Sequence, residues 1–163
     1  MLTQERLKQL LHYDPDTGVF TWISHQRRPD LIGSIAGFRQ SQGYSEINVD
    51  SRKYKAHRLA WLYVYGEWPS KHIDHENRVK GDNRIDNLRD ATKAQNEQNK
   101  GLRSSNSSGA TGVYWNKCAQ KWQAYITVEC RVRYLGIFAE KSQAVDVRRA
   151  AEREHFGKFA SAA

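Results

Sequence analysis

The chain has 163 residues, a formal net charge of +8 and a pI of about 9.6, which favours a polyanionic partner such as nucleic acid. No apolar run approaches the roughly 18 residues of a membrane-spanning helix, and the N-terminus lacks the basic-then-apolar order of a secretory signal. We therefore expect a cytoplasmic protein without a membrane partner. Cys118 and Cys130 lack CxxC spacing, which argues against a disulfide framework and against a zinc site.

The N-terminal part of the chain carries the patterns of a short helix, several strands and a second helix. Thr3 is a suitable N-cap for a helix that places Leu7, Leu10 and Leu11 on one face. After a turn at 14–18, runs rich in β-branched and aromatic residues predict strands at 19–22, 33–37, 44–49 and 53–56. The pattern becomes helical at 57–65, and Gly66 and Pro69 end it.

A segment at 101–109 divides the chain, because it is rich in Ser, Asn and Gly and lacks apolar periodicity. We interpret it as a linker between a first domain at 1–100 and a second at 110–163. The second domain has three strand-like runs, at 112–115, 121–128 and 131–136, and an amphipathic helix from Ser142 onward.

The positive charge is concentrated after residue 100. Lys and Arg outnumber Asp and Glu by 10 to 5 in residues 101–163, against 16 to 13 in residues 1–100. This asymmetry suits a nucleic-acid-binding unit attached to a unit with a different task.

The stretch from His72 to Asn99 is dense in Asp, His and Asn side chains, although Ile73, Ile85 and Leu88 tie it to a core. Holding polar groups beside a core costs free energy, and a catalytic role would explain why they are there. Hydrolysis of a phosphodiester needs a base, a cation to neutralise developing charge, and a scaffold that fixes both.

Four residues of this stretch suit those tasks. Histidine is the side-chain type whose unperturbed pKa lies near physiological pH, so His75 suits the general base. Asp74 and Asn96 offer the hard oxygen ligands that Mg²⁺ or Mn²⁺ favours. Asn87 can cap a helix that carries Thr92 and Asn96 on one face, and its amide can brace the loop that holds His75.

The adjacent positions of Asp74 and His75 set a geometric condition. In a regular strand the two side chains would point to opposite faces. We therefore expect the strand to bend or end there, because only then can both residues serve one phosphate.

These motifs resemble those of HNH endonucleases, particularly the phage-encoded and homing types. The matching residues are AHRLAW at 56–61, IDH at 73–75, DNR at 82–84, NLR at 87–89, and Asn96, within a core motif at 56–99. The resemblance implies an α+β fold in which short strands precede a ββα-metal unit, whose hairpin and helix hold one divalent ion.

The resemblance also implies a role for each motif residue. Asp74 and Asn96 would ligate Mg²⁺ or Mn²⁺, His75 would activate water, and Asn87 would keep the hairpin in shape. The third letter of the motif is Asn96 rather than His, and Asn99 is the alternative ligand.

The second domain resembles the AP2 DNA-binding domain. The matching residues are TGVYW at 111–115, KW at 121–122, YLGIF at 134–138 and the Ala-rich segment at 144–151. This resemblance implies a three-stranded antiparallel sheet with one packed helix, whose sheet lies in the major groove of double-stranded DNA. Tyr114, Thr127 and Val132 stand where plant AP2 domains tend to have arginine, so no sequence preference follows.

Basic and aromatic side chains near both motifs are the candidates for DNA contact. They are Arg58, Arg84, Arg89 and Lys93 in the first domain, and Trp115, Lys117, Trp122, Arg131, Arg133 and Tyr134 in the second. Arg131 and Arg133 alternate with Val132, so only one face of that strand can meet DNA. Trp122 fits a core position as well.

The sequence thus predicts a metal-dependent DNA endonuclease whose second domain supplies DNA affinity and site choice. The alternative is a non-catalytic DNA-binding protein on a degenerate HNH scaffold, and retention of Asp74, His75, Asn87 and Asn96 argues against it. An RNA-binding module would explain the charge and the aromatic residues but not the acidic cluster. For His57 a structural role is the simpler interpretation.

Overall fold

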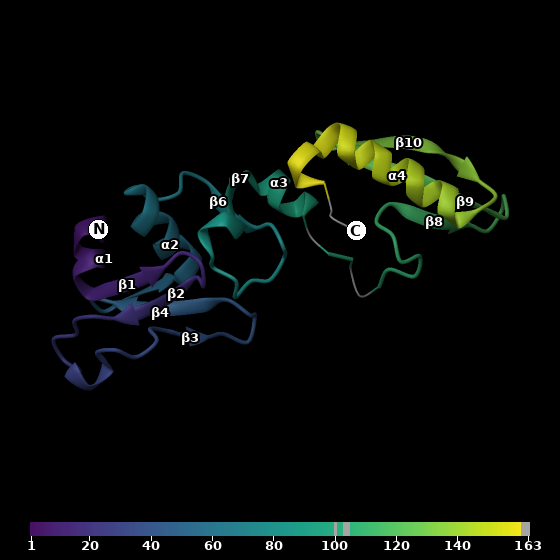
Figure 1. Ribbon diagram of the computed structural model, residues 1–163. Helices are drawn as coiled ribbons and strands as arrows, with labels where there is room; N and C mark the ends of the chain where they lie inside the picture. Colours follow the sequence, from purple (N-terminus) through teal and green to yellow (C-terminus); the bar gives the residue numbers. More distant parts are fainter. Residues whose placement is uncertain (100, 103–104, 161–163) are drawn as a thin grey trace. The chain divides into compact units, whose positions relative to one another are not determined.

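The computed structural model describes residues 1–99, 101–102 and 105–160. The chain forms two compact units, Met1–Asn96 (unit 1) and Glu97–Ala163 (unit 2). Four α-helices and several small antiparallel sheets confirm the α+β class (Figure 1). Residues 103–104 of the predicted linker lie outside the described residues. Within the described part, no helix is both long and apolar enough to cross a membrane.

Unit 1 begins with helix α1 (Gln4–Leu10), and Thr3 caps it by accepting a hydrogen bond from the backbone N–H of Arg6 at 3.2 Å. The predicted place of Leu11 on the helix is wrong. Leu11 takes extended backbone and opens strand β1 (Leu11–Asp14), which pairs with β2 (Val19–Trp22). Leu11 continues the i, i+4 spacing from Leu7 and also alternates with Tyr13 in the strand, so the apolar pattern fits either element at this position.

The strand predicted at 33–37 is also wrong. A 3-10 turn at Pro29–Leu31 precedes the segment. Backbone hydrogen bonds join Gly33, Ser34 and Ala36 to β2, but the segment forms only an isolated bridge, between Ile35 and Thr21, and not a continuous strand. Gly33 and Gly37 both take positive φ, which interrupts the extended run. Strand β3 (Phe38–Arg39) follows, and it joins β4 (Ser45–Val49) and β5 (Arg52–Lys55) in an antiparallel sheet of order β3-β4-β5.

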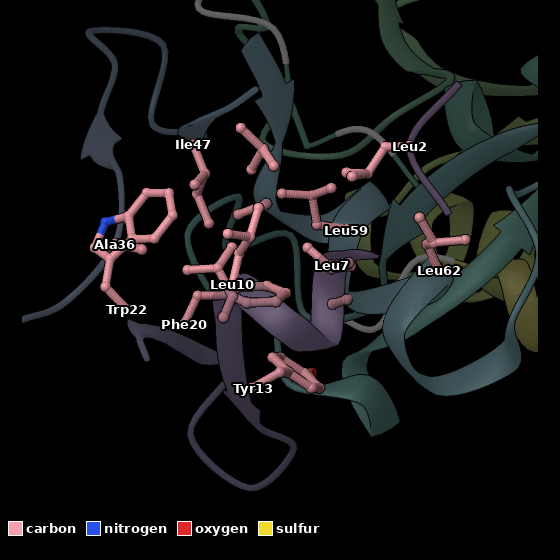
Figure 2. Packing of buried hydrophobic residues seen from close by; sticks show 14 of the residues in the cluster. Leu2, Leu7, Leu10, Tyr13, Phe20, Trp22, Ala36, Ile47, Leu59 and Leu62 are labelled. Atoms are coloured by element: carbon pink, nitrogen blue, oxygen red, sulfur yellow. The ribbon is translucent and has the colours of Figure 1, made fainter. Parts of the chain in front are cut away.

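Helix α2 (Ala56–Tyr65) follows β5 and ends at Gly66, as predicted, because Gly66 adopts left-handed backbone with φ 79°. The core of unit 1 forms where α2 meets α1 and β4. Leu7, Ile47 and Leu59 are each 0% exposed and converge there (Figure 2). Burying each such side chain contributes about 1.5–3 kcal/mol.

A polar hairpin is anchored to this core through Ile73 and Leu88. Its strands are β6 (His72–His75) and β7 (Leu88–Ala91), which pair antiparallel with Asp74 opposite Arg89. The loop between them ends in a 3-10 turn at Ile85–Asn87, and helix α3 (Lys93–Gln98) follows β7.

Unit 2 contains the three predicted strands and the predicted helix. Strands β8 (Val113–Asn116), β9 (Lys121–Val128) and β10 (Arg131–Phe138) form an antiparallel sheet of order β10-β9-β8. Helix α4 (Lys141–Phe156) lies along one face of this sheet, and a 3-10 turn at Gly157–Phe159 follows it (Figure 1). Val113, Ala124 and Ala144 form the small core between them.

Candidate active site

Strand β6 ends at His75, which satisfies the condition that the sequence sets for Asp74 and His75 to serve one site. Ile73, Asp74 and His75 are all buried, although a regular half-exposed strand would alternate. Three residues later Arg78 takes positive φ, and the chain turns into the loop that returns to β7.

The imidazole of His75 is buried and hydrogen-bonded to Asn83. It is 5% exposed, and its Nε2 lies 3.3 Å from Oδ1 of Asn83. Because an amide oxygen only accepts, this contact places the proton on Nε2 and leaves Nδ1 as the basic nitrogen. Burial lowers the pKa of His75, while Asn83 and the charge of Asp74 oppose that shift. The ring is therefore neutral at pH 7, as a general base must be.

The N-terminal hairpin supports Asn83. Its carbonyl oxygen accepts a hydrogen bond of 2.7 Å from the hydroxyl of Tyr13, which lies 70 residues away in the sequence. The turn between β1 and β2 also lies close to the backbone of Asn83 and Arg84. A Cβ atom at Gly18 would lie 2.4 Å from the backbone N of Arg84 and 2.5 Å from the carbonyl carbon of Asn83.

Replacing Gly18 with alanine should therefore lower the free energy of unfolding by about 2–4 kcal/mol, through positive-φ strain and overlap with backbone atoms. Gly33→Ala is the matched control. Its φ is also positive, at +86°, but a Cβ atom there meets nothing within 4 Å. It should lose only about 1 kcal/mol. Urea denaturation measures both, and equal losses would contradict the close approach at Gly18.

His57 of α2 packs against the His75 ring. Their centroids are 5.2 Å apart with the planes at 84°, and Tyr44 contacts both rings, at 5.4 Å from His57 and 6.0 Å from His75. Burial, followed by the nearby His75, Arg58 and Lys55, lowers the pKa of His57 to about 3. His57 is thus neutral at pH 7 and serves as a packing surface for His75.

Asp74 faces Arg89 across the hairpin. Both Nε and Nη2 of Arg89 lie 2.8 Å from Oδ2 of Asp74, and the two side chains are only 12% and 5% exposed. Nη1 of Arg89 also lies 4.0 Å from Glu76. The sequence predicts Arg89 as a DNA contact, whereas the structure places its guanidinium on the carboxylate of Asp74.

Asn87 braces the loop with both ends of its amide. Its Oδ1 accepts from the backbone N–H of Asn77 at 3.0 Å, and its Nδ2 donates to the carbonyl of Asp82 at 2.8 Å. The hydrogen bond from Arg84 lowers the pKa of Asp82 to about 2, so Asp82 stays charged in the same network at neutral pH. The predicted capping of a helix by Asn87 is wrong, because β7 follows it.

Helix α3 is capped by Thr92. The N–H of Gln95 donates to Oγ1 of Thr92 at 3.2 Å, and the N–H of Thr92 donates to Oε1 of Gln95 at 2.8 Å, which is a capping box. Thr92 is therefore the N-cap and not a helical neighbour of Asn96. Asn96 is half-buried within α3, and the alternative ligand Asn99, just after α3, is 5% exposed.

The remaining residues that the sequence predicts to contact DNA differ in exposure and in their partners. Arg58 is half-buried with its guanidinium 5.9 Å from the Trp68 ring, Arg84 is exposed and paired with Asp82, and Lys93 is exposed. In unit 2, Trp115, Lys117, Arg131, Arg133 and Tyr134 are exposed, whereas Trp122 packs against the core.

One segment thus contains a buried histidine beside an aspartate, a loop braced by an asparagine, and a following helix with Asn96. Residues 54–98 match the family model of the HNH endonucleases. The match includes Asp74, His75, Asn87 and Asn96, and it confirms the HNH part of the resemblance for residues 54–98, hereafter the HNH segment. No curated protein and no solved structure matches the chain.

HNH nucleases generally use a divalent metal, and the donors of the HNH segment fit a hard cation with few protein ligands. Asp74 supplies a buried carboxylate and Asn96 a half-buried amide oxygen, and water and phosphate oxygens commonly complete such a shell. Across the described ranges, no three His, Cys, Asp or Glu side chains gather into a metal-binding group. A cation at Asp74 must share this carboxylate with Arg89 or displace the guanidinium.

Proposed function

We propose that the chain is a metal-dependent endonuclease that hydrolyses phosphodiester bonds in double-stranded DNA. The observation that carries this proposal is the imidazole of His75, which is buried, bonded through Nε2 to Asn83, and adjacent to Asp74 in a segment that matches the HNH endonucleases. With the proton on Nε2 of a neutral ring, Nδ1 carries the lone pair that accepts a proton in this proposal.

In this mechanism Nδ1 of His75 takes a proton from the water that attacks the phosphorus atom. Asn83 keeps the proton on Nε2, and His57 and Tyr44 limit rotation of the ring by packing against it. The negative charge of Asp74 favours the imidazolium that forms. A divalent cation held by Asp74 and Asn96 would supply neutralisation of the charge on the phosphate and leaving oxygen.

In this proposal residues 110–163 act as an AP2-like domain that supplies affinity for DNA. Residues 101–163 have twice as many basic as acidic residues, 10 against 5, so they favour a polyanion. Arg84 and Lys93 of the HNH segment are exposed and suit phosphate contacts near the cleaved bond.

The test is cleavage of supercoiled plasmid by the full-length protein. With Mg²⁺ or Mn²⁺ the plasmid should become nicked or linear, and a chelator should stop the reaction. A gel-shift assay in the presence of chelator should show that DNA binding persists. Plasmid that binds the protein but stays supercoiled with either metal would favour the alternative, a non-catalytic DNA-binding protein on an HNH scaffold.

A further inference from the structure

Helix α4 covers one face of the sheet of unit 2 (Figure 1). On the other face, hereafter the open face, Tyr114, Val132 and Tyr134 are exposed. Val113, Ala124 and Ile126 are at most 1% exposed and mark the face toward α4. Side chains alternate along a strand, so the residues between them lie on the open face. The strand registers therefore determine which side chains a partner on the open face would meet.

Three tyrosines, one from each strand, form a row across this open face. The ring centroids of Tyr114 and Tyr125 are 5.6 Å apart, and those of Tyr125 and Tyr134 are 5.2 Å apart. Tyr114 is 53% exposed and Tyr134 is 55% exposed. The hydroxyl of Tyr125 donates to Oε1 of Gln123 at 3.3 Å, in agreement with a shared face.

The rest of this tyrosine face is mostly uncharged. Val132 pairs with Thr127 and Ile137 with Gln123, which places all four on it. Among the strand residues of β8, β9 and β10, all of which the structure describes, Lys121 is the charged residue on this face.

The two arginines of β10 lie on the other face. Arg133 pairs with Ile126, which is buried toward α4, and Arg131 pairs with Val128 two residues further along β9. Arg131, Arg133 and Lys117 are exposed at the edges of the sheet and in the turn after β8. Arg131 and Arg133 therefore do not lie on the tyrosine face.

We propose that the tyrosine face binds unpaired bases of a DNA strand by stacking. Because Lys121 is the charged strand residue on this face, the face offers aromatic rings to bases more than it offers cations to phosphates. Exposed aromatic rings suit bases that are out of a duplex, and Lys121 on the same face suits a phosphate of the single backbone. This inference rests on the proposed function for its choice of DNA, whose cleavage and fraying would expose such bases.

The test is fluorescence anisotropy with the full chain in chelator, which prevents cleavage during the measurement. The probes are an unstructured single-stranded DNA oligonucleotide, its RNA counterpart and a duplex of the same length. Tyr134→Ala should weaken single-strand binding by about 5- to 100-fold, because one stacked base is lost. Tyr134→Phe keeps the ring and should bind as the wild type does.

Tyr65→Ala is the matched control, because Tyr65 is a comparably exposed tyrosine, at 52%, in unit 1. It should leave single-strand binding unchanged, and circular dichroism should show that all variants are folded. Wild-type affinity in folded Tyr134→Ala, or an equal loss for duplex, would overturn the stacking face, and a preference for RNA would overturn the choice of DNA. If plasmid is never cut but Tyr134→Ala still loses single-strand binding, the proposed function fails and this inference stands.

Discussion

Replacing His75 with alanine should lower the rate of DNA cleavage by about 10²–10⁴-fold, the usual contribution of general acid–base catalysis, while DNA binding is retained. The loss follows because the basic nitrogen of the site is removed, whereas the cations that contact phosphate are untouched. His72→Ala is the matched control, since His72 belongs to the same strand but is exposed. Plasmid nicking measured under single-turnover conditions gives the rates of both variants.

Added imidazole should partly restore cleavage in His75→Ala, because it can occupy the space left beside His57 and Asn83 and accept a proton there. Thermal unfolding must show that the variant remains folded, so that lost cleavage is not lost structure. Equal cleavage by His75→Ala and the wild type would remove His75 from the mechanism.

Local signals in the sequence were sufficient where one residue decides an element. Thr3 as a cap and Gly66 as a helix end were both predicted, because each satisfies backbone groups within one turn. The capping box of Thr92 and Gln95 has the same local character, and its T-x-x-Q spacing could have placed the start of α3. Strand β1 was missed because Leu11 continues the apolar spacing of α1, so the pattern did not mark where the helix ends.

In the candidate site, too, the sequence indicates some features and not others. The HNH motif brought Asp74, His75, Asn87 and Asn96 to attention, but it did not reveal what holds them. Asn83 depends on a hydrogen bond from Tyr13 across 70 residues, which no periodicity encodes. Cross-strand pairing likewise gives Arg89 its partner, and charge alone indicated only a surface contact.

In unit 2 the strands could be predicted, but the face presented by each side chain could not. The alternation of Arg131 and Arg133 with Val132 left two possibilities, and pairing with β9 decides between them. The register also shifts between Tyr134 and Gly136, which changes the face of the residues that follow. Only the paired sheet therefore separates the tyrosines from the arginines.

Replacing Arg89 with methionine should lower the free energy of unfolding by about 3–5 kcal/mol in metal-free protein, because the buried carboxylate of Asp74 loses its ion pair with the guanidinium. Arg84→Met is the matched control. Arg84 also pairs with an aspartate, Asp82, but its side chain is 51% exposed, whereas that of Arg89 is 12% exposed. The control should lose only about 0–1 kcal/mol, since water screens exposed pairs. Urea denaturation with chelator measures both, and equal losses would contradict the buried pair.

Mg²⁺ or Mn²⁺ should then stabilise Arg89→Met more than the wild type, because a cation at Asp74 no longer competes with the guanidinium. Binding to the native state alone adds about 2.7 kcal/mol at one hundred times the dissociation constant. Adding Asp74→Asn to Arg89→Met removes both charges, so the double variant should be more stable than Arg89→Met without metal and should lose the response to metal. A metal response that survives in the double variant would place the cation elsewhere than Asp74. Loss of the response would identify this carboxylate as the ligand for which Arg89 and the metal compete.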